Sequence, residues 1–147
     1  MKILVPTDFS ECAAAAQATA ADLARKLGAD IVLLHVLVET PLYGEGLLSG
    51  PRVQSVYDAE RKWAESALDE RIAELRGQGI KASRRVTMGI PFEEIVNVAG
   101  EEHAEMIVIG THGRSGLNRA LLGSVAERVI RLAPCPVLTV RPPERSR

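Results

Sequence analysis

Residues 106–125 read MIVIGTHGRSGLNRALLGSV: an apolar run, a glycine-rich loop and the beginning of a helical pattern. The run Met106–Ile109 predicts a buried strand, because apolar residues follow one another without alternation. Glycines stand at 110, 113, 116 and 123, where they let the backbone approach a ligand closely. Exposed loop amides and a helix N-terminus near Ser124 both favour an anion. The stretch therefore predicts a strand followed by a phosphate-binding loop, as in a nucleotide site.

Strand-like and helix-like stretches alternate along the rest of the chain. Short apolar runs predict strands, and apolar residues at helical spacing predict helices. Five strands separated by four helices indicate an α/β fold with an open parallel sheet and helices on both faces. Nothing divides the chain, so we expect one domain over residues 1–147. The expected strands are Ile3–Val5, Ile31–Val38, Lys81–Met88, Met106–Ile109 and Val137–Val140, and the expected helices are Glu11–Leu27 (capped by Ser10 and Gly28), Val53–Gly77, Pro91–Ala99 and Ser124–Leu132.

The carboxyl ends of the expected strands bring candidate binding residues together. In open parallel sheets, ligands bind beyond these ends, where neighbouring connections leave the sheet in opposite directions. We therefore expect a pocket at one edge of the sheet, built from segments far apart in sequence. These segments are Pro6-Thr7-Asp8, His35-Val36, Met88-Gly89 and Gly110.

The composition is typical of a soluble protein, with 46% hydrophobic and 25% charged residues. A formal net charge of −1 argues against broad nucleic-acid binding, which usually accompanies a basic excess. No apolar segment is long enough to cross a bilayer, and the opening MKILVPTDFSE lacks the apolar core of a signal peptide. Cys12 and Cys135 lack the spacing of a metal or redox motif. We expect a cytoplasmic protein whose cysteines pack as small apolar residues.

The position of the glycine loop excludes the commonest nucleotide-binding motifs. A Walker loop needs Gly-Lys-Ser/Thr, which does not occur in the chain. A Rossmann fingerprint follows the first strand, but the turn here reads TDFSEC and contains no glycine. Protein-kinase signatures are absent as well. The phosphate loop instead follows the fourth strand.

The spacing of Gly110, Gly113 and Gly123-Ser124 resembles the pattern of the nucleotide-binding branch of the universal stress protein family: Gly, two residues, Gly, nine residues, then Gly-Ser or Gly-Thr. Further similar blocks are ILVPTDFSE at the start, LLHV in the second strand, MGIPFEEIV, and CPVLTV at the last strand. The resemblance spans essentially the whole chain, and these blocks occur in the family's order.

The resemblance implies a sheet order of 3-2-1-4-5, as in adenine nucleotide alpha hydrolase-like folds, so that Asp8 faces the Gly110 loop. It implies a bound adenine nucleotide, ATP or else AMP or ADP. The Asp8 carboxylate would accept a ribose hydroxyl. The residues implied on the adenosine side are Pro6, Thr7, Asp8, Val36, Met88 and Gly89, and those implied on the phosphate side are Gly113, Gly123, Ser124 and Val125.

The resemblance also bears on metal and partners. A divalent ion such as Mg²⁺ bridging the phosphates is compatible with the family, although no carboxylate cluster in the sequence predicts it. The strand Val137–Val140 would pair with a second copy of itself and form a homodimer. Neither a protein partner nor a stress signal can be named from these residues.

Several residues keep two interpretations. Asp8 contacts the ligand or merely caps the first helix. His112 approaches a phosphate or makes a structural hydrogen bond within its loop. Arg114 and Arg119 reach phosphate or remain solvated. Trp63 is interpreted as helix packing, His35 as a packed or hydrogen-bonded strand residue, and His103 as exposed.

Three functions follow from these residues. The first is a nucleotide-binding regulatory dimer with at most slow hydrolysis, because the loop offers binding but no convincing base or arginine finger. The second is a true ATPase or nucleotide-processing enzyme. The third is a partner-binding module with an empty pocket, against which the intact glycine pattern argues.

Overall fold

In the computed structural model, which describes residues 1–38, 51–113 and 121–144, five parallel strands form one sheet in the order β3-β2-β1-β4-β5. The sheet order implied by the resemblance is confirmed. Gly116, Arg114 and Arg119 lie outside the described residues, as does most of the expected loop Thr40–Arg52. The strands are β1 (Lys2–Pro6), β2 (Asp30–Val38), β3 (Ala82–Gly89), β4 (Met106–Gly110) and β5 (Val137–Val140).

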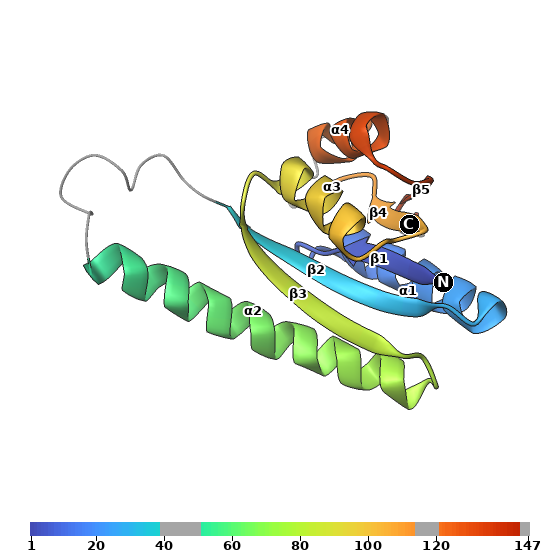
Figure 1. The fold of residues 1–147 in the computed structure, drawn as a ribbon, viewed down its shortest axis with the longest axis horizontal. Coiled ribbons are helices and arrows are strands. Elements are labelled where there is room, and N and C mark those ends of the chain that lie inside the picture. The colour runs from blue at the N-terminus through green and yellow to red at the C-terminus, as the bar shows by residue number, and fades with distance from the viewer. Residues whose placement is uncertain (39–50, 114–120, 145–147) are drawn as a thin grey trace.

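Helices cover both faces of this sheet, as predicted (Figure 1). The first two lie on one face, where alanines of the first helix pack with Leu68, Ile72 and Leu75 of the second. The last two lie on the other face, where Val98 and Val129 pack against the strands. The helices are α1 (Glu11–Leu27), α2 (Pro51–Gly77), α3 (Pro91–Glu101) and α4 (Ser124–Leu132).

Local sequence explains where the helices begin and end. Ser10 accepts a hydrogen bond from the amide of Ala13 at 3.2 Å and so caps α1, as expected. Gly28 ends the helix with a φ of 66°, a left-handed conformation that glycine adopts without strain. Helix α2 begins at Pro51, two residues before the predicted Val53, because proline suits the first turn of a helix.

Strand β1 lies between β2 and β4, and this places the point where the connections diverge. From β1 the chain crosses by α1 to β2, whereas from β4 it crosses by α4 to β5 on the other side. Neighbouring strands thus send their connections in opposite directions and leave a crevice between their carboxyl ends. The segment after β1 and the segment after β4 meet there.

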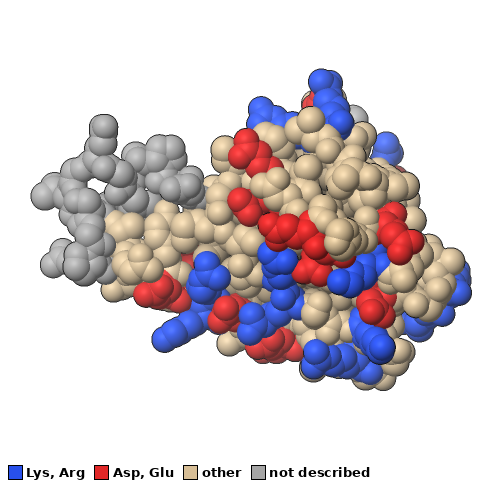
Figure 2. Space-filling view, viewed as in Figure 1, with Lys and Arg blue, Asp and Glu red and all other residues tan. Residues whose placement is uncertain are grey.

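Charged side chains on the surface form mixed groups. Arg85 bonds Glu101 at 2.7 Å and Glu102 at 2.8 Å, and Lys2 bonds Glu102 at 3.0 Å. The hydrogen bonds from Arg85 and then Lys2 hold the pKa of Glu102 below its ordinary value. Acidic and basic side chains lie interspersed on the face shown in Figure 2. Among the described helices, none has the length and apolar character needed to span a membrane.

Candidate functional site

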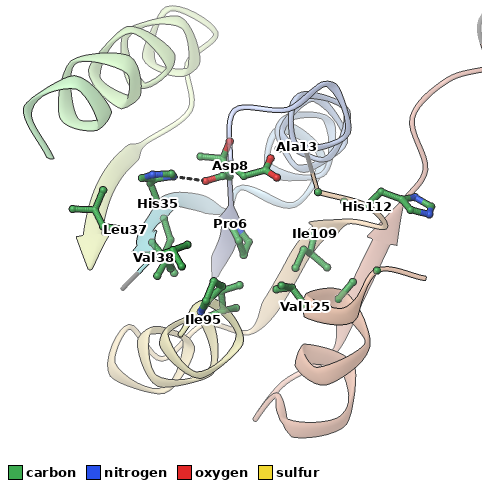
Figure 3. A pocket seen from close by; sticks show the side chains of 18 of the residues that line it. Pro6, Asp8, Ala13, His35, Leu37, Val38, Ile95, Ile109, His112 and Val125 are labelled. Carbon is green, nitrogen blue, oxygen red and sulfur yellow. Dashed lines mark hydrogen bonds between the residues drawn. The ribbon is translucent and has the colours of Figure 1, made fainter. Parts of the chain in front are cut away.

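A cavity of about 780 Å³ opens at the carboxyl edge of the sheet. Its walls come from the ends of β1, β2 and β4 and from parts of α2, α3 and α4 (Figure 3). Most of the predicted binding residues therefore lie together in space. Those that line the cavity are Pro6, Thr7, Asp8, Val36, Gly110, His112, Gly113, Gly123, Ser124 and Val125.

Met88 and Gly89 do not line this cavity. They pair with Leu37 and Val38 at the end of β3, which is separated from β1 by the whole of β2. A side chain at Gly89 would place its Cβ 2.8 Å from an oxygen of Glu94, so the glycine serves the turn into α3. Pro91, from the same turn, lines the cavity in their place.

Glycines shape one side of the cavity because there is no room for side chains. A Cβ at Gly110 would lie 2.8 Å from the Cys12 sulfur and 3.0 Å from its carbonyl carbon. A Cβ at Gly123 would lie 2.9 Å from the backbone carbonyl oxygen of Thr111, which accepts a hydrogen bond from the Gly123 amide at 2.7 Å. Both ends of the glycine loop are thereby fixed next to the start of α4.

The N-terminus of α4 faces the cavity through Ser124 and Val125. Its N-cap is Gly123, which has no side chain to cap the first turn. Amides in the first turn of a helix need an acceptor, and the helix end carries partial positive charge. A phosphate group would satisfy both requirements.

Cys12 and Thr111 support the glycine loop from beneath, and sequence reasoning missed this role. The Cys12 sulfur lies 3.8 Å from the Thr111 hydroxyl, accepts from the His112 amide at 3.5 Å and donates to the Val140 carbonyl at 3.5 Å. Cys12 is buried, as expected, but it also ties α1 to the loop and to β5. Its position two residues after the N-cap was the available signal.

His112 makes a structural hydrogen bond within its loop. Its Nδ1 lies 3.0 Å from the hydroxyl of the neighbouring Thr111. Figure 3 shows the imidazole turned away from the middle of the cavity. The interpretation as a structural residue is therefore the one that the geometry favours.

Asp8 lies where the two sides of the cavity meet. One carboxylate oxygen accepts a hydrogen bond from the amide of Ser10 at 3.0 Å, so Asp8 orders the turn before α1 while Ser10 provides the cap. The other oxygen would lie 3.0 Å from a Cβ at Gly113. Asp8 thus faces the glycine loop across the crevice, as the resemblance implied.

Aromatic rings form the opposite side. The Nδ1 of His35 lies 2.8 Å from the Thr7 carbonyl (dashed line in Figure 3), and its ring centroid is 4.7 Å from that of Phe9. Trp63 meets Phe9 edge to face at 5.0 Å. The interpretation of Trp63 as helix packing is wrong, because Trp63 is 57% exposed and lines the cavity. His35 is hydrogen-bonded, as expected.

The described residues contain no group of three or more His, Cys, Asp or Glu side chains that could hold a metal ion.

Apolar residues form the floor between the two sides. Ile95 of α3 and Ile109 of β4 are buried there beside Pro6 (Figure 3). A pocket with an apolar floor and polar groups at its rim suits a ligand that is part ring and part anion.

Known proteins match this chain over most of its length. The model of the universal stress protein family matches residues 1–141. Universal stress protein MJ0531 of Methanocaldococcus jannaschii is 35% identical over 144 residues, covering 98% of this chain and 84% of that protein. The solved structure of protein MJ0577 from the same organism is 34% identical with a TM-score of 0.84, covering 99% and 97% of the two chains. The structure of the universal stress protein from Archaeoglobus fulgidus in complex with dAMP is 27% identical with a TM-score of 0.70, covering 95% and 97%.

Proposed function

The chain belongs to the universal stress protein family, and from this premise we propose that it is an ATP-binding, cytoplasmic regulatory protein. Nucleotide occupancy would change its stability or its contacts with a partner. The observation that carries the proposal is the glycine side of the cavity, where the backbone leaves no space for side chains and α4 begins at a glycine N-cap. The dAMP complex of the Archaeoglobus fulgidus relative supports an adenine nucleotide.

The phosphates would lie against the glycine loop and the first turn of α4. Amides of Gly113 and Val125 and the hydroxyl of Ser124 are the proposed donors. Hydrogen bonds to charged groups are the stronger ones, and the helix dipole adds to them. Mg²⁺ would be held by phosphate oxygens and water, because Mg²⁺ needs few protein ligands at nucleotide sites.

The adenosine would extend from Asp8 over the apolar floor. The Asp8 carboxylate, already oriented by the Ser10 amide, would accept a hydrogen bond from a ribose hydroxyl. Val36 and Ile95 would flank the base, since both line the cavity beyond Pro6. This arrangement replaces Met88 and Gly89 by residues that line the cavity.

We favour regulation over catalysis because the cavity is organised for ground-state binding. Phosphoryl transfer needs a positioned base or water-orienting group and cations at the transferring phosphate. Of the histidines that line the cavity, His112 is bonded to Thr111 with its ring turned away from the middle of the cavity, and His35 is bonded to Thr7. Hydrolysis would be slow, and a true ATPase is the alternative that kinetics would reveal.

A homodimer through β5 belongs to the same proposal. Within the described residues, β5 pairs with β4 on one side and with no strand on the other. The carbonyls of Pro136 and Val140 accept from the amides of Ile107 in β4 and of Thr111 just after it. The intervening Val137 and Thr139 therefore direct their backbone groups outward. An unpaired strand edge is a template for pairing with another chain. Thr139→Pro removes one outward amide and should shift the mass measured by light scattering from dimer to monomer.

The test of the nucleotide proposal is mass spectrometry of whatever the purified protein releases on denaturation, followed by timing of ATP loss with Mg²⁺. Co-purified ATP that persists for hours would support a binder whose occupancy carries the signal. Rapid conversion to ADP or AMP would replace the regulator with an enzyme. Absence of nucleotide, together with no uptake on titration, would refute the function and leave the fold unaffected.

A further inference from the structure

The N-terminal half of α2 carries a face that the sheet does not cover. Tyr57, Glu60 and Trp63 recur at intervals of three residues and therefore share one side of the helix, and all three line the cavity. Further along α2, Ala64 and Leu68 are fully buried against the strands. The helix thus changes from core packing to cavity wall within one turn.

Trp63 is the chain's one tryptophan, and its exposure is unusual for so large an apolar side chain. The residue is 57% exposed although it makes an edge-to-face contact with Phe9. Val56, about two turns earlier on α2, is 44% exposed but does not line the cavity. Of these two exposed residues, only the tryptophan has an aromatic surface and a place in the cavity wall.

Phe9 packs against the indole and is itself held by several contacts. The Phe9 ring contacts His35 at 4.7 Å and Trp63 at 5.0 Å, and the Arg71 guanidinium lies 4.8 Å from its centroid. Phe9 also has a φ of 63°, and its amide bonds the Thr7 hydroxyl at 3.0 Å. A non-glycine residue with positive φ persists only where its surroundings hold it. The platform behind Trp63 is therefore rigid.

We infer that Trp63 forms an aromatic subsite for the planar base of the bound nucleotide, on the α2 side of the cavity. This inference rests on the proposed function, because the ribose is placed at Asp8. Asp8 and Trp63 line the same cavity, and Asp8 lies where its two sides meet, so a base attached to that ribose can extend to the α2 wall. Purine rings stack on exposed indole, and a preoriented indole loses little freedom on binding.

The single tryptophan makes the subsite directly observable. Titration of the wild-type protein with ATP should quench or shift the Trp63 emission. Inorganic tripolyphosphate, which has phosphates but no base, should bind by calorimetry without that change. Trp63→Ala should weaken ATP binding about tenfold, a typical loss for a base–aromatic stack, and leave tripolyphosphate affinity unchanged. Trp63→Phe, which keeps a ring, should recover most of the affinity.

Val56→Ala is the matched control, because Val56 is exposed on the same helix outside the cavity wall, and it should bind ATP as wild type does. Circular dichroism should be unchanged in all three variants, since neither side chain is buried. ATP binding to wild type with no change in emission, together with wild-type affinity in Trp63→Ala, would overturn the subsite and leave the proposed function standing. Failure of ATP to bind wild type at all would overturn both.

Discussion

The two sides of the cavity are built in different ways. The glycine side, residues 110–113 and 123–125, is made of backbone, and added Cβ atoms at Gly110 or Gly123 would meet fixed atoms at 2.8–3.0 Å. The aromatic side is made of the side chains of Phe9 in the turn after β1, His35 of β2 and Trp63 of α2, in contact at ring centroid distances of 4.7 and 5.0 Å. On the glycine side, an added side chain would collide with neighbouring atoms. On the aromatic side, a side chain can be shortened without moving the backbone. Substitutions on the glycine side should therefore cause large losses of stability and nucleotide affinity, and those on the aromatic side smaller losses.

The largest effect is expected from Gly110→Val, which forces a side chain against Cys12. Overpacking of this kind costs about 1–3 kcal/mol, and the displaced loop should also lose the nucleotide. Thermal unfolding and ATP titration would measure the two losses. Gly100→Ala is the control, because a Cβ at Gly100 meets nothing within 4 Å; it should bind ATP as wild type does and melt no lower than wild type, since alanine suits a helix better than glycine. A wild-type melting temperature for Gly110→Val would contradict this account, because it would show that the backbone at Gly110 shifts to accommodate a side chain.

Asp8→Ala should have the next largest effect, because Asp8 serves both sides. The variant loses the proposed ribose contact and the acceptor for the Ser10 amide at 3.0 Å. A hydrogen bond to a charged group contributes roughly 1.5–3 kcal/mol, so ATP affinity should fall by at least that much. Asp8→Asn keeps an acceptor for Ser10 and should retain more stability by thermal unfolding while still binding ATP weakly. Equal ATP affinity in wild type and both variants would remove Asp8 from the site.

Ser124→Ala sharpens the comparison, because it removes a side-chain hydroxyl from the glycine side, which is otherwise made of backbone. Ser124 is exposed at the first position of α4, and its amide remains in the variant. One lost hydrogen bond to phosphate should weaken ATP binding by roughly 1.5–3 kcal/mol without changing the melting temperature. Calorimetry with AMP alongside ATP would locate the contact. Loss of stability instead of affinity would identify Ser124 as a structural residue.

The smallest effect is expected outside both sides, at Glu102. Its pKa is lowered by Arg85 and Lys2, so its contribution to stability is present above the ordinary glutamate pKa and is lost as pH falls through the folded value. Because the group is near the surface, Glu102→Gln should cost at most about 1 kcal/mol. The melting temperatures of wild type and variant should converge on acidification, with ATP affinity the same in both at neutral pH. A difference that persists at low pH would mean that the ion pairs are not its cause.

The sequence predicted the glycine side better than the aromatic side, and the reason is physical. The glycine loop is one short segment, and the positions of its glycines indicate where side chains do not fit. Gly110, Gly113 and Gly123 all line the cavity. Apolar runs likewise located β1, β2 and β4 to within one residue, because strands buried on both faces are apolar along their length. Sheet order came from the family resemblance.

The aromatic side depends on contacts between residues far apart in the chain. Trp63 lies off the buried stripe of α2 that Ala64 and Leu68 form, but the helical pattern does not say whether it faces solvent or a cavity. Met88 was misplaced for a related reason. The carboxyl ends of all the strands share one edge, but β3 is too far from the crevice for its last residues to line it.

The most direct test of the phosphate site compares wild type with Gly113→Val by calorimetric titration with ATP. A Cβ at Gly113 would lie 3.0 Å from the Asp8 carboxylate and would project between the two sides of the cavity. Wild type should show saturable binding, and the variant should show none while keeping its circular dichroism spectrum. Wild-type affinity in a folded Gly113→Val protein would contradict the assignment of the glycine loop to phosphate.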